Sequence, residues 1–520
     1  MRGMGETAGN FTGRLKAALT GTRDAELVFL GNFEVEDQWA RGEPGLPRLT
    51  FGSGNVIVNR MDEFALLLAG KDDHVVLKGE PDADYLSHLE ELGLDLPGML
   101  VVERQDPGST VTQDALEDQP VLRELGRLGA RGGVLSAHGV GELEERLAER
   151  AGIPLAAPSA AVCKAVNSKI YSRRLATELG IRQSRGWTCA SLAELDAAVE
   201  AARALLADGR RVALKDAFGV SGKGIEVVAD ERRLDRLHRM VLSRARKTGD
   251  DRVGLVVEEW VAKRADLNYQ FTVGRDGRVH FDFVKEALTE GGVHLGHRIP
   301  ARLTERQTAE LTEVSRLLGG RLADDGYFGV VGVDAMVDPD GGLYPVVEIN
   351  ARHNMSTYQA SIQESFIGSG STALVRRYPL RLGAPLPFGT LRRALADLLF
   401  DPARGTGLLI NNYATVNAAA STGKRAPGAG FDGRLHGIVV ADSEDRLAAL
   451  DEEVGRRLAA VAETTKRSAG STAMGRQPSA APSWLPARRE PHIDTAPAPL
   501  QGAAEPQRTS PDPLGREERG

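Results

Sequence analysis

The stretch Val346–Arg352 reads VVEINAR, an apolar run that ends in a carboxylate, an amide and a guanidinium. In a strand, residues two apart point to the same face, so Glu348 and Asn350 would present their oxygens side by side. Magnesium is held in proteins by oxygen ligands of this kind, usually one or two carboxylates with substrate phosphates. The stretch therefore indicates a metal-binding strand end, although a buried strand with a solvated acidic end would give the same pattern.

A second acidic residue lies upstream in a similar apolar run. Asp334 ends the run Phe328–Asp334, and the turn Asp338–Gly342 separates it from the first stretch. The turn sequence Asp-Pro-Asp-Gly-Gly is typical of a hairpin connection. An antiparallel pair would bring Asp334 next to Glu348, so we expect Asp334, Glu348 and Asn350 to be the metal ligands.

A glycine loop between two strand-like segments indicates an anion-binding turn. The segment Arg211–Lys215 is followed by Gly219–Gly224 and then by Ile225–Val228. Backbone amides of such a loop can approach a phosphate closely, and Lys215 would lie beside it as a point charge. The spacing is not that of a P-loop, because no Gly-Lys-Ser/Thr opens a helix. An ordinary hairpin remains the alternative interpretation.

The run Leu255–Val261 ends in two acids and an aromatic residue, Glu258, Glu259 and Trp260. A strand end of this composition can offer backbone and carboxylate contacts to a purine. An exposed strand end with no ligand is the alternative.

The order of these residues along the chain resembles the ATP-grasp superfamily. The resemblance assigns nucleotide contacts to Lys169, Lys215, Gly222, Lys223, Gly224, Glu258, Glu259, Trp260, Asp266 and Lys285, and metal contacts to Asp334, Glu348 and Asn350. Residues 167–181 resemble the segment that opens the nucleotide site in D-alanine–D-alanine ligase. Residues 279–285 resemble the strand that carries the later phosphate-binding lysine. The likeness covers roughly residues 135–365.

Both ends of the chain resemble the pheganomycin-type peptide ligases. Residues 27–34 are similar to their pre-ATP-grasp domain, and residues 408–413 and 423–427 are similar to their small C-terminal domain. The implied fold class is α/β. The implied domains are a Rossmann-like parallel-sheet pre-ATP-grasp domain at 1–150, an ATP-grasp domain of two α+β lobes at 151–400, a small C-terminal α/β domain at 401–465 and a disordered tail at 466–520.

The resemblance implies an ATP-dependent ligase that activates a carboxylate as an acyl phosphate and joins it to an amine of an amino acid or peptide. The implied cofactors are ATP and magnesium or manganese. The implied role is natural-product biosynthesis in the cytoplasm. A homodimer is compatible with the resemblance. Lys285 would contact the phosphoryl group while it is being transferred. The ligase family places an arginine two residues before the first metal acid, where this chain has Gly332. Arg352 or Arg298 must then stabilise the tetrahedral intermediate.

Two other functions fit the same residues. The enzyme could activate a carboxylate for a thiol or hydroxyl acceptor, or the chain could be an ATP-binding regulatory module without turnover. The complete set of acids and lysines argues against the regulatory module.

Composition excludes several other classes of protein. The 520 residues include 42% hydrophobic ones and carry a net charge of −7 with interspersed signs, so we expect several domains and no nucleic-acid partner. No apolar run reaches about 18 residues, and the N-terminus lacks an apolar signal core, so no membrane partner is expected. The two cysteines, Cys163 and Cys189, suggest a reducing compartment and core packing.

The first 150 residues alternate between strand-like and helix-like segments, which predicts a parallel sheet covered by helices. Strands are expected at 55–59, 74–77, 99–102 and 133–137, and helices at 61–69, 82–92, 113–128 and 140–152. Capping boxes at Ser191 with Glu194 and at Thr304 with Gln307 predict the starts of two further helices.

Several histidines and acids remain as secondary candidates. His294 and His297 lack a cysteine partner for zinc and would instead contact substrate, while His353 either lines the site or packs. The acids Glu34, Glu36 and Asp37 follow the first strand, where α/β sheets bind ligands, and could hold the ammonium group of an amine acceptor. A solvated acidic loop is the alternative.

Deleting the residues beyond 470 should leave the melting temperature and ATP turnover unchanged, because this proline-rich tail has no apolar periodicity with which to bury surface. Differential scanning calorimetry and an ADP-release assay on the truncated chain check this. A clear loss of either property would contradict the assignment of a disordered tail.

Overall fold

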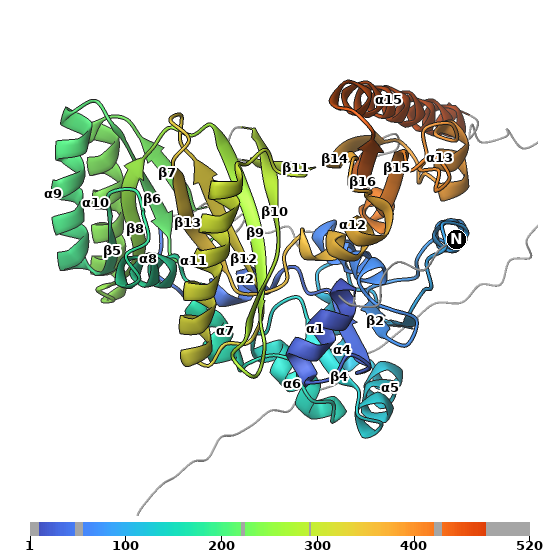
Figure 1. Ribbon diagram of the computed structural model, residues 1–520, viewed down its shortest axis with the longest axis horizontal. Coiled ribbons are helices and arrows are strands. Elements are labelled where there is room, and N and C mark those ends of the chain that lie inside the picture. Colours follow the sequence, from blue (N-terminus) through green and yellow to red (C-terminus); the bar gives the residue numbers. More distant parts are fainter. Residues whose placement is uncertain (1–9, 47–55, 220–223, 291–292, 421–428, 475–520) are drawn as a thin grey trace, which may run out of the picture. The chain divides into compact units, whose positions relative to one another are not determined.

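The computed structural model describes residues 10–46, 56–219, 224–290, 293–420 and 429–474, and these residues form three β-sheets with helices packed against them (Figure 1). The α/β fold class with an N-terminal parallel sheet is confirmed. The disordered tail expected at 466–520 is wrong for residues 466–474, which continue helix α15 (Glu444–Met474). Residues 475–520 lie outside the described residues. Among the described helices, none is long and apolar enough to cross a membrane.

The N-terminal region contains a four-stranded parallel sheet in the order β3-β2-β1-β4. Its strands are β1 (Leu27–Leu30), β2 (His74–Leu77), β3 (Gly98–Val101) and β4 (Val134–Ala137). Its helices are α1 (Phe11–Thr20), α2 (Val35–Trp39), the 3₁₀ helix η1 (Val58–Leu67), α3 (Ala83–Glu91), α4 (Val111–Glu117), α5 (Gln119–Ala130) and α6 (Glu142–Ala151). From β1 the sheet extends through β2 and β3 on one side and to β4 on the other, so the strand order changes direction at β1. Ligands bind at such a switch point in open α/β sheets.

Two of the expected elements in this region differ from the structure. The strand expected at 55–59 is wrong for its described part, because the 3₁₀ helix η1 begins at Val58. Asp62 of η1 accepts a hydrogen bond from the backbone amide of Lys78, which ties the segment to the end of β2. The helix expected at 113–128 is two helices, because Asp118 caps α5 by accepting from the amide of Val121 and thereby ends α4.

A second, four-stranded antiparallel sheet follows in the order β5-β8-β6-β7. Its strands are β5 (Gly186–Ser191), β6 (Arg211–Asp216), β7 (Ile225–Val228) and β8 (Arg252–Trp260). The helices α9 (Leu192–Ala207) and α10 (Glu231–Thr248) cover one face, and α7 (Ala160–Val166) and α8 (Lys169–Glu178) precede the sheet (Figure 1). The predicted capping box of Ser191 and Glu194 is present at the start of α9.

The third sheet has eight strands in the order β13-β12-β9-β10-β11-β14-β16-β15. Its strands are β9 (Ala265–Val273), β10 (Val279–Glu290), β11 (Val293–Ile299), β12 (Gly329–Val337), β13 (Leu343–Asn350), β14 (Thr372–Leu382), β15 (Gly407–Asn412) and β16 (Phe431–Ala441). Its helices are α11 (Glu305–Asp324), the 3₁₀ helix η2 (Thr357–Gln359), α12 (Ala360–Phe366), α13 (Phe388–Ala394), α14 (Ala414–Asn417) and α15 (Glu444–Met474).

The strands of the C-terminal region continue the large sheet, because β14 pairs with β11 on one side and with β16 on the other. The predicted capping box of Thr304 and Gln307 is present at the start of α11, which packs against β9 and β10. The long helix α15 packs against β14 and β16 (Figure 1). The domain boundaries expected from the sequence stay a prediction.

Candidate active site

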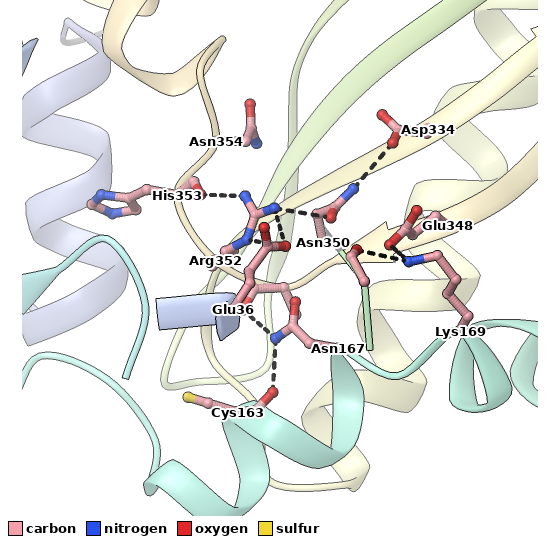
Figure 2. A network of polar contacts seen from close by, with 12 residues as sticks. Glu36, Cys163, Asn167, Lys169, Asp334, Glu348, Asn350, Arg352, His353 and Asn354 are labelled. Carbon is pink, nitrogen blue, oxygen red and sulfur yellow. Dashed lines mark hydrogen bonds and ion pairs between the residues drawn. The ribbon is translucent and has the colours of Figure 1, made fainter. Parts of the chain in front are cut away.

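The hairpin β12–β13 brings two carboxylates face to face. Asp334 is paired directly with Glu348 in the antiparallel register, and Asn350 lies two residues further on the same face. The Asn350 amide donates to Asp334 Oδ2 over 3.3 Å (Figure 2). The Asn268 amide of β9 donates to Asp334 Oδ1 over 3.0 Å. Burial, and then the charge of Glu348, raise the pKa of Asp334 to about 6.

Lys169, the first residue of α8, lies between the hairpin and the glycine loop. Its ammonium group forms an ion pair with Glu348 and donates to the carbonyl of Gly219 over 3.2 Å (Figure 2). Ser168 caps the helix, and the amide of Lys169 donates to the carbonyl of Ala217 over 2.9 Å. These bonds hold a buried cation beside both the acids and the end of β6.

A pocket lies between the second sheet and the β12–β13 hairpin, with an empty volume of about 410 Å³ that includes space open to solvent. The residues that line it are Lys169, Ser172, Arg173, Gln183, Ser184, Lys215, Val256, Glu258, Met336, Tyr344, Val346 and Val347. Glu258 Oε1 pairs with the Lys215 ammonium group over 2.5 Å, and its Oε2 accepts from Arg173 over 2.8 Å. Three sequence candidates, Lys169, Lys215 and Glu258, therefore meet in one pocket.

Sequence reasoning missed several residues of this pocket. Arg173 and Ser172 lie one turn after Lys169 on the same face of α8, and a helical spacing of three and four residues could have identified them. Tyr344 and Met336 lie on the hairpin between Asp334 and Glu348 in sequence, and nothing in their local sequence distinguishes them from core residues.

Other predicted nucleotide contacts lie outside the residues that line this pocket. Glu259 pairs with Arg210 over 2.7 Å, and Trp260 ends β8 opposite Arg211. Asp266 accepts from Thr289 over 2.6 Å and pairs with Lys263. Gly224 begins the approach to β7 with a φ of +89°, and its carbonyl accepts from the amide of Asp216 over 2.8 Å. Gly222 and Lys223 lie outside the described residues.

Lys285 is fully buried one strand away from Asn268. Its ammonium group donates to the carbonyl of Ser356 over 3.1 Å and to Gln359 Oε1 over 3.0 Å, and it lies 4.3 Å from the centre of the Phe283 ring. Burial holds its pKa well below the usual range. The structure therefore places Lys285 next to the acid cluster, which consists of Asp334, Glu348 and Asn350, but bonds it to the segment that follows β13.

The two candidate arginines occupy different surroundings. Arg352 donates to Asn350 Oδ1 over 3.2 Å and to Glu36 Oε1 of α2 over 2.5 Å, so it joins the acid cluster to the N-terminal region (Figure 2). Arg298 of β11 pairs with Glu444 of α15. The geometry brings Arg352, and not Arg298, to the acids.

The side chain of His353 packs between ring systems. Its ring lies 6.5 Å from that of Phe29 and 6.0 Å from that of Tyr358, and burial, then the charge of Arg352, lower its pKa to about 4. His297 is buried on β11, and the side chain of His294 lies outside the described residues. In the described part of the chain, no group of three or more His, Cys, Asp or Glu residues could hold a metal.

The two thiols and the acids after β1 lie in different surroundings. Cys163 and Cys189 are free and buried, and burial raises the pKa of each to about 12, which suits core packing. Glu36 is held by Arg352, and Asp37 is exposed. Neither carboxylate oxygen of Glu34 has a hydrogen-bond partner among the described residues, and burial, with the charges of Glu144 and Asp62, raises its pKa to about 8.

Comparison with known proteins places these features in context. The family described as the pre ATP-grasp domain matches residues 61–153. A [butirosin acyl-carrier protein]–L-glutamate ligase of Niallia circulans is 28% identical over 324 residues, which cover 62% of this chain and 71% of that protein. These findings confirm the resemblance predicted from the sequence.

Solved structures match at the level of the fold. A pyruvate carboxylase of Rhizobium etli aligns with a TM-score of 0.50 and 15% identity over 83% of this chain and 37% of that chain. A biotin carboxylase of Campylobacter jejuni aligns with a TM-score of 0.48 and 15% identity over 82% of this chain and 90% of that chain.

Replacing Glu34 with glutamine should reduce the decrease in unfolding free energy that occurs between pH 4.5 and 8. The folded state keeps the proton of Glu34 up to about pH 8, whereas the unfolded chain releases it near 4.5, so the unfolding free energy decreases as pH rises through this window. The slope is about 1.4 kcal/mol per pH unit for a single group. Urea titrations of wild type and Glu34→Gln at several pH values check this.

The matched control for this prediction is Asp37→Asn in helix α2, which Glu34 directly precedes; this change removes an exposed charge. Identical pH profiles for wild type, control and Glu34→Gln would show that Glu34 ionises normally in the folded state.

Proposed function

We propose that this chain, an ATP-grasp protein by its pre-ATP-grasp domain and fold, is an ATP-dependent ligase that activates a carboxylate as an acyl phosphate and joins it to an amine. One observation carries the proposal: the partly buried carboxylates of Asp334 and Glu348 face each other on paired strands, and Lys169, which pairs with Glu348, lines a pocket together with Lys215 and Glu258. The similarity to a ligase that is named for joining an acyl-carrier protein and L-glutamate supports a ligase that acts on an amino acid.

The pocket between the second sheet and the hairpin suits a nucleotide. Lys169 and Lys215 are buried cations that now pair with Glu348 and Glu258, and both could turn to phosphate oxygens when ATP enters. The apolar walls from Val256, Met336 and Val346 suit a purine ring. Lys285 would join these lysines only if the segment at Ser356–Gln359 releases its ammonium group.

The acid cluster fits magnesium or manganese. Like charges directly opposite on a strand pair are destabilising, and burial makes the repulsion between Asp334 and Glu348 stronger. A divalent cation held by Asp334, Glu348 and Asn350 would neutralise them, and when bound it would offset charge on the phosphates during transfer. The two amides that hold Asp334 keep its carboxylate oriented toward such a cation.

Arg352 is the residue of this chain best placed to stabilise an oxyanion. The position of the arginine in D-alanine–D-alanine ligase corresponds to Gly332, where an added Cβ would lie 2.3 Å from Asn354 Nδ2, so a side chain there would require the Asn354 side chain to move. Gly332 pairs with Asn350, and Arg352 follows two residues later with its guanidinium against Asn350 Oδ1. Arg352 therefore supplies a cation to the same corner from the neighbouring strand.

The roles of the site follow from charge. The lysines would orient the γ-phosphoryl group toward the substrate carboxylate. An unprotonated amine would then attack, the C–O bond to phosphate would break, and Arg352 would stabilise the negative oxygen of the tetrahedral intermediate. Products would be an amide, ADP and inorganic phosphate.

Replacing Lys215 with alanine should weaken ATP binding by one to two decades and affect the acid substrate far less, because a charge-assisted contact contributes roughly 1.5–3 kcal/mol. Isothermal titration calorimetry with ATP checks this. Lys263→Ala, which removes a cation that pairs with Asp266 outside the pocket, is the matched control. ATP affinity within twofold of wild type would remove Lys215 from the nucleotide site.

A trapping experiment tests the reaction itself. Purified protein is incubated with ATP, magnesium and a panel of amino acids, short peptides and other carboxylic acids, with hydroxylamine present. We expect ADP rather than AMP, and a hydroxamate formed from the acyl phosphate. Glu348→Gln should abolish both signals, whereas Asp340→Asn, an exposed acid in the same hairpin turn, should keep them.

The acceptor is tested in the same reactions. Peptides with a free N-terminus should compete with hydroxylamine, and N-acetylated peptides should not. Competition by thiols alone would point to a thiol acceptor, and AMP release would replace phosphoryl transfer with adenylation. Normal turnover by Glu348→Gln would refute the metal assignment.

A further inference from the structure

Two arginines with no counter-ion among the described residues lie on neighbouring strands of the C-terminal region. Arg377 of β14 is opposite His436 of β16, and Arg434 is two residues before His436, so the three side chains lie on one face. The His436 ring meets the Phe64 ring edge-on, with centroids 5.0 Å apart, which places this face toward η1. The neighbouring Tyr378 points the other way and donates to Asp451 of α15 over 2.6 Å.

Neither guanidinium makes an ion pair or a hydrogen bond with another described residue. The nearby acid Asp432 is exposed and pairs with Arg381 over 3.0 Å. His436 is only 8% exposed, and its Nε2 has no hydrogen-bond partner in the described structure.

The arrangement is unfavourable unless an anion joins it. Burial, and then the positive charge of Arg377, lower the pKa of Arg434, and burial with the charges of both arginines lowers the pKa of His436 to about 3. His436 is therefore neutral and can donate one ring N–H. Two planar guanidinium groups and one such donor match the oxygens of a carboxylate or a phosphate.

This cluster shares a face of the large sheet with the acid cluster. Asp334 pairs with Asn268, which pairs with Lys285, and Ala287 on the same face of β10 pairs with His297. His297 in turn pairs with Val375, two residues before Arg377. Strand spacing and rise per residue put the two clusters on the order of 20 Å apart across this face.

We infer that Arg377, Arg434 and His436 form a binding site for a carboxylate or phosphate group at the far end of a ligase substrate. The inference rests on the proposed function, because the reacting carboxylate or amine would lie at the acid cluster while the second anionic group lies at the arginines. The substrate class is an elongated molecule that carries an anionic group on the order of 20 Å from its reacting end.

Direct anion binding tests the site without turnover. Thermal unfolding of the full chain is followed while inorganic phosphate, or separately acetate, is titrated at constant ionic strength, with millimolar ADP and magnesium in every sample to occupy the nucleotide pocket. Wild type is compared with Arg377→Gln/Arg434→Gln and with the charge-matched control Arg381→Gln/Arg446→Gln, whose arginines pair with Asp432 and Asp442. A ligand that binds the folded state raises the melting temperature with its concentration.

We expect the double variant to bind the preferred anion at least about tenfold more weakly than wild type and the control. A larger response to phosphate or to acetate identifies which group the site takes. Arg434→Gln alone should give a smaller loss and serves if the double variant does not fold. Equal responses in wild type and variants would overturn the site.

Kinetics separate this inference from the proposed function. With an active acid–amine pair, the double variant should raise the KM for the anionic substrate at least about tenfold and leave the KM for ATP unchanged. An unchanged KM for every substrate would overturn the link to catalysis. If the double variant loses phosphate binding while wild type releases no ADP with any substrate, the anion site is upheld and the proposed ligase function is refuted.

Discussion

The carboxylates of Asp334 and Glu348, brought face to face by the β12–β13 register, are the constraint around which the site is built. Two adjacent acids in a partly buried place are costly unless each is compensated. Asn268 and Asn350 donate to Asp334, and Lys169 pairs with Glu348. Each of these partners comes from a different element, so the compensation of two charges fixes β9, β13 and α8 relative to one another.

Ion pairs occupy the pocket where ligand charges would lie. Lys215 and Arg173 both bind Glu258, and Lys169 binds Glu348. A buried pair contributes little net stability, because desolvation offsets most of the attraction, but removing one partner leaves an expensive unpaired charge. Such pairs therefore keep long cationic side chains ordered within the pocket while leaving them able to exchange one anionic partner for another.

The N-terminal region is tied to the same cluster through one guanidinium. Arg352 contacts Asn350 beside the acids and Glu36 in α2, more than three hundred residues earlier in the chain. The backbone amide of His353 also donates to the carbonyl of His138 at the end of β4. The ends of β1 and β4, where an α/β sheet binds ligands, thus lie against the strand that carries the acids.

Much of the site could be predicted from the sequence because its signals are local. Strand alternation and the Asp338–Gly342 turn were sufficient to predict that Asp334 would face Glu348 and that Asn350 would share their face, since both depend on a repeat of two residues and a short turn. The glycine-rich approach to β7 and the capping boxes at Ser191 and Thr304 were equally local. Their catalytic and binding roles stay predictions.

Tertiary structure alone decided the partner of each charged side chain. Local patterns could not distinguish Arg352, which reaches the acids, from Arg298, which pairs with Glu444 of α15. Nor could they reveal that Lys285 is bonded to Ser356 and Gln359, or that β14 and β16 extend the large sheet and carry Arg377 and Arg434, which have no counter-ion in the described part of the chain. The physical reason is range: backbone geometry follows from neighbours in the chain, whereas a side-chain charge is neutralised by whichever distant element packing brings within a few ångströms.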